Sequence, residues 1–225
     1  MDSSVLRSVP IFTEFDDDQL VELAARYTVR AYPKGSVVVR EGDRGGSLHV
    51  ILAGSVAVVR TNGDGRETIL SILKHREFFG EMSLFDEAAR SATVRTVEFS
   101  RIASIERPDI VALIGASPEI GRSLIVALSR RLRDANELIT AATLHDVPSR
   151  VATLLLRLMQ GFGQPVTGGT KIGLKLTNLE MANMVGSTRE SVNRALNRFW
   201  DEHLIDMRSS HIVVVEPEKL RALIP

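Results

Sequence analysis

The stretch LTNLEMANMVGSTRESVNRALNRFW, residues 176–200, decides the fold of the C-terminal part of the chain. It contains two signatures of a capped helix start, in each of which a hydroxyl residue is followed three positions later by a glutamate. Thr177 precedes Glu180 in the first signature, and Ser187 precedes Glu190 in the second. Because such side chains satisfy the free N–H groups of a first helical turn, the stretch predicts two helices.

The two helices are expected to begin near Asn178 and near Thr188, with Gly186 in the turn between them. Two short helices across a tight glycine turn predict a helix-turn-helix. Residues 204–215 then predict two strands around a Ser-Ser turn, with His211 in the second strand near the turn. A hairpin directly after the second helix indicates a winged variant of the motif.

The second helix is predicted to have an apolar face and a polar face. The apolar stripe follows helical spacing and consists of Val192, Ala195, Leu196 and Phe199. The other side presents Arg, Glu and Asn side chains, which can contact guanine, cytosine and adenine edges in a major groove. Residues 147–225 carry ten Lys or Arg and seven Asp or Glu, which permits a polyanionic partner. We expect DNA binding, with candidate contacts at Thr177, Ser187, Arg189, Glu190, Asn193, Arg194 and Asn197. The alternative is a solvated helix face, with Glu190 used as the capping carboxylate.

A long helix is expected before this motif, because Ser117 can cap it, Pro118 suits its first position and Glu119 suits its first turn. Apolar residues spaced by three and four then form a heptad-like seam of Ile125, Leu128, Leu132, Ala135, Ile139 and Ala142. The seam favours pairing with a second copy of the chain, which gives a homodimer. The alternative is a helix packed on its own domain.

The remaining segments are predicted from turn and strand signals. A hinge is expected at Val147-Pro148-Ser149, followed by a helix from about Ser149 to Gln160 and a loop over residues 161–169. Up to about residue 108, turn signals separate the short apolar segments SVVVR, SLHVIL, SVAVVR and ETILSIL, which predict a β-sandwich or roll. Asp16-Asp17-Asp18 predicts the start of a small N-terminal helix.

Composition excludes several classes of function. The 225 residues include no cysteine, which excludes disulfides, thiolate-bound metal sites and cysteine nucleophiles. The sequence shows no signal peptide and no apolar run of membrane-helix length, so we expect a cytoplasmic protein with no membrane partner. The five histidines lack metal-ligand spacing, and neither a serine–histidine–acid arrangement nor a phosphate-binding loop is evident. We therefore expect no metal and no enzymatic activity.

Two motifs resemble those of one known family. FGEMSLFDEAARSATV, residues 79–94, resembles the phosphate-binding cassette of the cyclic-AMP receptor protein (CRP/FNR) family of transcriptional regulators. STRESVNR, from Ser187 to Arg194, resembles the recognition helix of that family. The resemblance implies an α+β fold, with a cyclic-nucleotide-binding β-roll over residues 1–116, a dimerisation helix over 117–146 and a winged helix-turn-helix DNA-binding domain over 147–225.

The resemblance also implies a cyclic-nucleotide site. It assigns Arg90 to clamp the phosphate and Glu81 to accept the ribose 2′-OH. The other implied ligand contacts are Gly80, Met82, Ser83, Ser91, Arg131, Ala135 and Asn136. Ala135 departs from the threonine usual in the family, whereas Asn136 keeps an amide that can pair with adenine. The cassette is also a little shorter than in the best-known member, between Phe85 and Arg90.

The function implied by the resemblance is allosteric control of DNA binding. Cyclic AMP is the implied effector, and the implied DNA site is a palindrome with TGTGA-like halves. RNA polymerase is the implied protein partner, with the loop from Gln164 to Thr170 as a candidate contact. Three alternatives stay open: the same fold acting without cyclic AMP, a cyclic-nucleotide-binding module that regulates a partner protein, and an enzyme.

Overall fold

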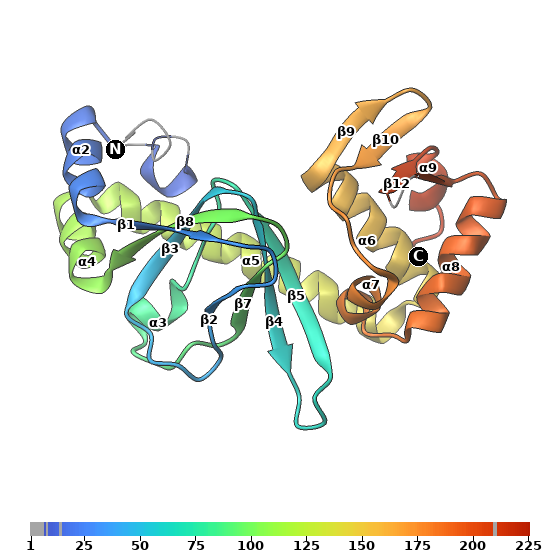
Figure 1. The fold of residues 1–225 in the computed structure, drawn as a ribbon, viewed down its shortest axis with the longest axis horizontal. Helices are drawn as coiled ribbons and strands as arrows, with labels where there is room; N and C mark the ends of the chain where they lie inside the picture. The colour runs from blue at the N-terminus through green and yellow to red at the C-terminus, as the bar shows by residue number, and fades with distance from the viewer. Residues whose placement is uncertain (1–6, 8, 14, 209–210) are drawn as a thin grey trace. The chain divides into compact units, whose positions relative to one another are not determined.

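The computed structural model describes the chain except residues 1–6, 8, 14 and 209–210 (Figure 1). The chain divides into two compact units, Met1–Leu132 and Arg133–Pro225. The helix α5 (Pro118–Leu144) begins in the first unit and ends in the second.

The first unit is built from two antiparallel sheets of four strands each. One sheet has the order β1-β8-β3-β6, formed by β1 (Thr28–Tyr32), β8 (Ser100–Glu106), β3 (Ser47–Ala53) and β6 (Phe78–Phe79). The other has the order β2-β7-β4-β5, formed by β2 (Val37–Val39), β7 (Thr93–Thr96), β4 (Ser55–Thr61) and β5 (Glu67–Lys74). The four apolar segments predicted as strands are β2, β3, β4 and β5, so that prediction is confirmed.

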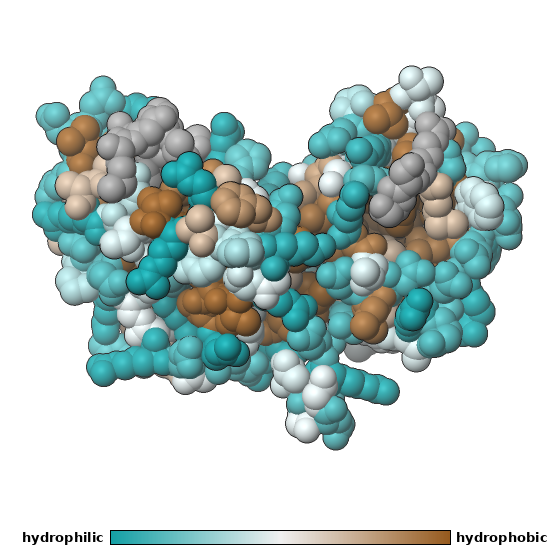
Figure 2. Space-filling view, viewed as in Figure 1, coloured by the Kyte–Doolittle hydropathy of each residue, from teal (hydrophilic) through white to brown (hydrophobic). Residues whose placement is uncertain are grey.

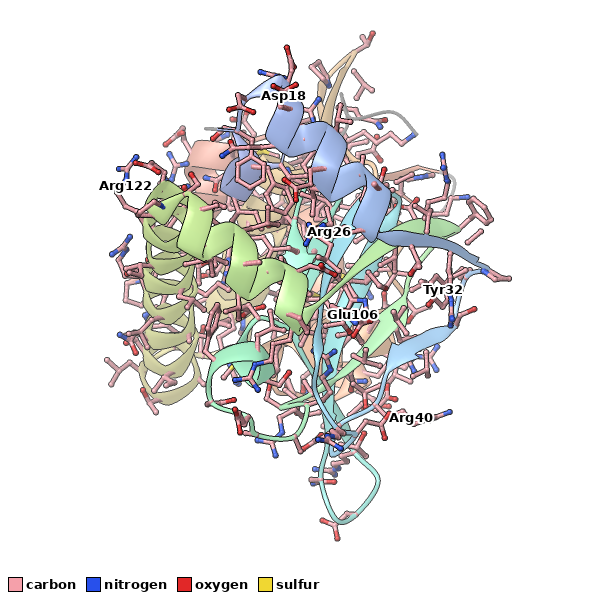
Figure 3. All side chains as sticks on the ribbon, turned by 90° about the vertical axis from the view of Figure 1, so that its left-hand side faces the viewer. Asp18, Arg26, Tyr32, Arg40, Glu106 and Arg122 are labelled. Atoms are coloured by element: carbon pink, nitrogen blue, oxygen red, sulfur yellow. The ribbon has the colours of Figure 1, made fainter. Side chains whose placement is uncertain are left out.

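Short helices surround the first sheet. They are the 3₁₀ turn η1 (Pro10–Phe12), α2 (Asp17–Arg26), α3 (Met82–Phe85) and α4 (Arg107–Ala116). The predicted N-terminal helix is α2, and Asp16 caps it together with Gln19 in a capping box. In Figure 3, α2 and α4 lie side by side, and an ion pair of 3.0 Å joins Arg26 of α2 to Asp109 of α4.

The main core of the first unit lies between the first sheet and these helices. The strand β3 supplies Leu48 and Val50, which alternate with residues on the other face because successive strand side chains point to opposite sides. The α2, α4 and α5 helices cover these residues with Leu20, Leu23, Ile110, Leu113, Ile120 and Leu124. The first turns of α5 are therefore part of this core.

The second unit contains the predicted helix-turn-helix. It comprises the end of α5, α6 (Val147–Phe162), β9 (Gly163–Val166), β10 (Gly169–Ile172), α7 (Asn178–Val185), α8 (Arg189–Asp201), β11 (Ile205–Arg208), β12 (His211–Val214) and α9 (Pro217–Arg221). Its antiparallel sheet has the order β11-β12-β10-β9. Gly186 ends α7 in the left-handed conformation, with φ of 63°, which a glycine adopts without strain. The Ser-Ser turn predicted between β11 and β12 lies outside the described residues.

The structure corrects several boundaries. Val147-Pro148-Ser149 is not a hinge but the first turn of α6, because Asp146 caps that helix and proline is tolerated in a first turn. The predicted loop over residues 161–169 is wrong, since α6 extends to Phe162 and the hairpin of β9 and β10 follows. The helix α4 had no sequence-based prediction.

The surface is mostly polar, and Figure 2 shows apolar residues gathered in separate patches on one face. Within the described part of the chain, no single helix has both the length and the apolar composition to cross a membrane. The pair α4 and α5 passes that test only when combined, and the two helices meet at a bend of 114°.

Candidate functional site

The cassette of residues 79–94 runs from β6 through α3 to β7 in the first unit. Leu84 fixes α3 in the main core. Gly80, just before α3, has φ of 86°, and a Cβ atom there would lie 2.4 Å from Nη1 of Arg90 and 2.9 Å from the carbonyl oxygen of Ser47. Glycine is therefore required at this position, both by the backbone conformation and by the close approach of Arg90.

Arg90 is buried in the cassette, with 6% of its surface exposed. Its Nη1 donates to the carbonyl oxygen of Gly80 and to Oγ of Ser83, both at 3.0 Å. Its Nη2 donates to the carbonyl oxygen of Ser47 at 2.9 Å and to Oγ of Ser47 at 3.0 Å. Nε2 of His49 lies 3.3 Å from the same Nη2. The guanidinium is thus surrounded by acceptors from the cassette on one side and from β3 on the other.

The backbone of Arg90 is fixed to the loop between β2 and β3. Its N–H donates to the carbonyl oxygen of Asp43 at 2.8 Å, and its carbonyl oxygen accepts from the N–H of Gly42 at 2.9 Å. Burial lowers the pKa of Arg90, while Glu81, Glu106 and Asp43 act in the opposite direction. Of these carboxylates, Glu106 is labelled in Figure 3. Arg90 stays charged at neutral pH, because a guanidinium is too weak an acid to lose its proton there, and it is suited to hold an anion.

Glu81 is the second buried charge of the cassette, with 3% of its surface exposed. Its Oε1 accepts a hydrogen bond of 2.7 Å from Nη1 of Arg131, which lies on α5. Nη2 of Arg131 donates to the carbonyl oxygen of Phe78, and the guanidinium lies 4.7 Å from the centre of the Phe78 ring. Glu81 thus links the cassette to the long helix through an ion pair and a cation–π contact.

The structure brings together five of the nine sequence-predicted ligand residues: Gly80, Glu81, Ser83, Arg90 and Arg131. Ser83 is buried, and it accepts from Arg90 while donating to the carbonyl oxygen of Gly80. Met82 and Ser91 lie at the exposed rim, where Oγ of Ser91 contacts the sulfur of Met82 at 3.6 Å. Ala135 and Asn136 are exposed residues of α5 in the second unit.

Sequence reasoning missed Ser47 and His49, which approach Arg90 from β3. Their pairing partners lie far away in the sequence, since β3 is hydrogen-bonded to β6 and β8. A signal was present in SLHVIL, where Ser47 and His49 alternate with the apolar Leu48 and Val50. That alternation places two polar side chains on one face of a strand that is otherwise apolar.

The helix-turn-helix presents a polar surface on α8. Thr177 caps α7 in a capping box with Glu180, as predicted, so its hydroxyl is already hydrogen-bonded. The second box is wrong: Thr188, not Ser187, caps α8 by accepting from the N–H of Ser191. With Ser187 as the cap, α8 would begin at Thr188, but it begins one residue later, at Arg189. The cap is therefore Thr188, which accepts from the residue three positions on, Ser191.

The exposed side chains of α8 include all five predicted base-contacting residues: Arg189, Glu190, Asn193, Arg194 and Asn197. Because Thr188 is the cap, the carboxylate of Glu190 is not used to close a capping box. The backbone N–H of Glu190 and the hydroxyl of Thr188 lower the pKa of Glu190, so it is ionised at neutral pH.

Nδ2 of Asn178 donates to Oδ1 of Asn193 at 3.0 Å, which connects α7 to α8. These two asparagines, with Arg189 and Glu190, line a shallow hollow of about 240 Å³.

Comparison with known proteins assigns both units. The family model of the cyclic nucleotide-binding domain matches residues 29–117, and that of the Crp-like helix-turn-helix domain matches residues 149–223. A CRP-like cAMP-activated global transcriptional regulator of Mycobacterium tuberculosis is 33% identical over 216 residues, which cover 96% of each chain. The chain belongs to the CRP/FNR family of transcriptional regulators.

Other members of the CRP/FNR family are similar over nearly the whole chain. The cyclic AMP receptor protein of Thermus thermophilus is 32% identical over 220 residues, which cover 97% of this chain and 98% of that protein. Among solved structures, the c-di-GMP responsive global regulator CLP of Xanthomonas campestris is 29% identical with a TM-score of 0.77, over 88% of this chain and 99% of that chain.

As a CRP/FNR protein, the chain is a DNA-binding transcriptional regulator with a cyclic nucleotide-binding domain. The predicted fold class is confirmed: a sheet-rich N-terminal part, a long helix and a C-terminal helix-turn-helix with a β-hairpin wing. Proteins of this family regulate transcription and are not enzymes.

Proposed function

We propose that this regulator responds to cyclic AMP, acts as a homodimer in the cytoplasm and binds palindromic DNA with TGTGA-like half-sites. The observation that carries the proposal is the pair of buried, oppositely charged groups in one cassette, Arg90 and Glu81. Burying charges is unfavourable unless partners compensate for lost hydration, so such groups are typical of a binding site. Relatives that are 33% and 32% identical are named as cAMP-activated or as a cyclic AMP receptor, which supports the choice of effector.

The residues of the cassette suit a cyclic phosphate attached to a ribose. Arg90 would hold the phosphate charge, assisted by the hydroxyl of Ser91 and the N–H groups of Met82 and Ser83. Glu81 would accept the ribose hydroxyl with the oxygen that does not bind Arg131. For the base, Asn136 offers an amide to adenine, whereas Ala135 offers no polar group.

The proposed dimer rests on an exposed apolar stripe along α5. Ile125, Leu132 and Ile139 are 65%, 64% and 63% exposed in the single chain, and they recur every seven residues. A second copy of α5 would cover this stripe in the manner of a coiled coil. Two recognition helices would then face successive major grooves about 34 Å apart, which explains a palindromic site.

The hairpin of β9 and β10 is the proposed contact with RNA polymerase. It contains the predicted contact segment from Gln164 to Thr170. All four residues of β9 are exposed, so the hairpin offers an accessible edge.

The central experiment combines calorimetry with DNA binding. Cyclic AMP and cyclic GMP are titrated into the full-length protein, and a gel shift on one TGTGA palindrome is run with and without each nucleotide. We expect heat with cyclic AMP and tighter DNA binding in its presence, because a ligand shifts an equilibrium only by its differential affinity for the two states. Arg90→Ala should abolish both effects, and unchanged binding by this variant would contradict the proposed clamp.

DNA reading by α8 leads to a prediction for Arg189→Ala. Removing the guanidinium should weaken binding to the palindrome by about 1–3 kcal/mol, because a bidentate contact to guanine is lost. A gel shift on matched and scrambled duplexes measures the effect. Equal weakening on both duplexes would assign Arg189 to phosphate contact instead of base reading.

A second candidate function is control by a different effector or by none. All four N–H bonds of Nη1 and Nη2 of Arg90 can be satisfied by the protein, through Gly80, Ser83 and Ser47. The solved structure at 29% identity is of a regulator described as responsive to c-di-GMP. Titration with c-di-GMP, and DNA binding by the ligand-free protein, distinguish this candidate from the first.

A further inference from the structure

His49 is a buried histidine next to the cassette, with 6% of its surface exposed. Antiparallel pairing places it opposite Phe79 of β6 on one side and Ser104 of β8 on the other. Its ring stacks on Phe79, with centroids 4.9 Å apart and planes at 18°. Its Nδ1 lies 2.9 Å from Oγ of Ser104, and its Nε2 lies 3.1 Å from Oγ of Ser47. Both ring nitrogens are therefore in contact with polar groups.

The neighbouring arginine favours one of the two positions for the ring proton of His49. Nη2 of Arg90 carries only donors, and Nε2 of His49 lies 3.3 Å from it. A lone pair on Nε2 suits this donor-only neighbour better than a second hydrogen, so the geometry favours the tautomer with the proton on Nδ1, donated to Ser104. Burial, with a further contribution from Arg90, lowers the pKa of His49 to about 4, so the ring is neutral at pH 7.

This tautomer also sets the direction of the hydrogen bond from Ser47. The hydroxyl of Ser47 accepts from Nη2 of Arg90 at 3.0 Å, and it can donate its own hydrogen to Nε2 of His49. The chain of donors then runs from Arg90 through Ser47 to His49, and from His49 to Ser104. Each hydrogen that points along this chain, from Arg90 to Ser47, from Ser47 to His49 and from His49 to Ser104, has an acceptor, as a buried network requires.

The acceptors of Arg90 divide into two groups. Ser47 holds Nη2 with its carbonyl oxygen and hydroxyl and belongs to the sheet, with His49 next to it, whereas Gly80 and Ser83 hold Nη1 and belong to the cassette. A phosphate bound in the cassette would compete with the second group and leave the first intact. Because the guanidinium is planar, fixing Nη2 also fixes the plane in which Nη1 presents its hydrogens.

We propose that His49, as the neutral Nδ1–H tautomer, is a positioning residue that orients Arg90 through Ser47 and thereby strengthens binding of an anionic cyclic phosphate. This inference rests on the proposed function of the cassette. The competing explanation is that His49 only fills space against Phe79.

Two substitutions separate orientation from space filling. His49→Phe keeps an aromatic ring against Phe79 but removes both nitrogens. His49→Gln removes the ring but carries an amide oxygen that can take the place of Nε2 as acceptor. If orientation matters, His49→Gln retains binding and His49→Phe loses it, whereas space filling predicts the reverse order. His75→Phe and His75→Gln are the matched controls, because His75 is exposed in the turn before β6.

The test is calorimetric titration of cyclic AMP into the full-length wild type and the four variants at pH 7, with thermal melting to verify folding. We expect the Kd to rise about tenfold in His49→Phe and to stay within about threefold of wild type in His49→Gln, the size of one hydrogen bond to a charged group. Both control variants should bind like wild type.

Nitrogen NMR of the imidazole gives a second readout that space filling does not affect. It should show Nδ1 protonated and Nε2 free in wild type. A proton on Nε2, or equal binding by His49→Phe and wild type, overturns the inference alone. Absence of heat with cyclic AMP in the wild type and in both His75 controls overturns the proposed function and the inference with it.

Discussion

At the residue scale, the first unit holds two buried charged groups that each depend on a partner from another element. Arg90 is compensated by carbonyl and hydroxyl oxygens of β3 and of the cassette, and Glu81 by the guanidinium of Arg131. A buried charge that loses its partner is strongly destabilising, so these contacts fix the local structure. The same contacts gather charged and polar groups in one cassette, where we propose that a small anion binds.

The neutral state of His49 predicts a pH dependence of stability. Its pKa is lowered from 6.5 to about 4 by burial and by Arg90, so between these values the unfolded chain binds a proton that the folded chain does not. Stability should therefore fall as pH falls through this window, by about 3 kcal/mol in full. The free energy of unfolding, measured by urea titration from pH 7 to pH 4, should show this loss in wild type and not in His49→Phe. The groups facing His49 are Arg90, Ser47, Ser104 and Phe79, none of which titrates in that range.

Gly80 leads to a second prediction at this scale. Alanine there must adopt φ of 86° and place Cβ against Arg90 and the carbonyl oxygen of Ser47. Gly80→Ala should lower the melting temperature and weaken nucleotide binding by at least about tenfold, because Arg90 has to move. Gly46→Ala is the control, since no heavy atom lies within 4 Å of a Cβ at that position. Similar behaviour of the two variants would contradict a close approach at Gly80.

At the element scale, the helix starts decide the helix-turn-helix. Thr188→Ala should destabilise the second unit by about 1 kcal/mol, because the N–H of Ser191 loses its acceptor. Ser187→Ala should have little effect, although the sequence pattern alone favours Ser187 as the cap. Melting of the two variants under one set of conditions compares them, and a larger loss for Ser187→Ala would support the original pattern.

The sequence was most informative where an element depends on local side chains. The starts of α2, α5 and α7 could be predicted because capping residues and first-turn prolines act within three residues of the helix start. The hairpin of β9 and β10 was missed because glycines and a proline in GFGQP signal a loop, although an edge strand tolerates proline. The start of α8 was misplaced because three consecutive polar residues offer two alternative caps.

The candidate site could be predicted only in part for a related reason. Glu81 and Arg90 lie in one short motif, so a local pattern indicates both. Ser47 and His49 reach Arg90 only through the pairing of β3 with β6 and β8, which no local pattern contains. The pairing of Arg131 with Glu81 likewise depends on how α5 packs against the cassette.

At the scale of the whole molecule, the exposed stripe of α5 predicts the oligomeric state. Leu132→Glu should convert a homodimer to a monomer, because it places charge in the middle of the apolar seam. Sedimentation velocity measures the mass, and DNA binding to a palindrome should weaken in parallel. Glu137→Lys is the control, since Glu137 is exposed on α5 away from the stripe. A monomeric wild type would contradict the proposed dimer.

The packing of the first turns of α5 limits how the helix can move. Ile120 and Leu124 are inserted in the main core of the first unit, and a close-packed interior allows no sliding of such side chains without opening voids. Piston-like travel along the helix axis is thereby blocked at this end. Ala127 also packs against this core, so torsion and bending are available only beyond it, and Arg131 is the point at which Glu81 can act on them. A change that starts in the cassette would therefore be transmitted as rotation or tilting of α5, and not as translation of α5 along its axis.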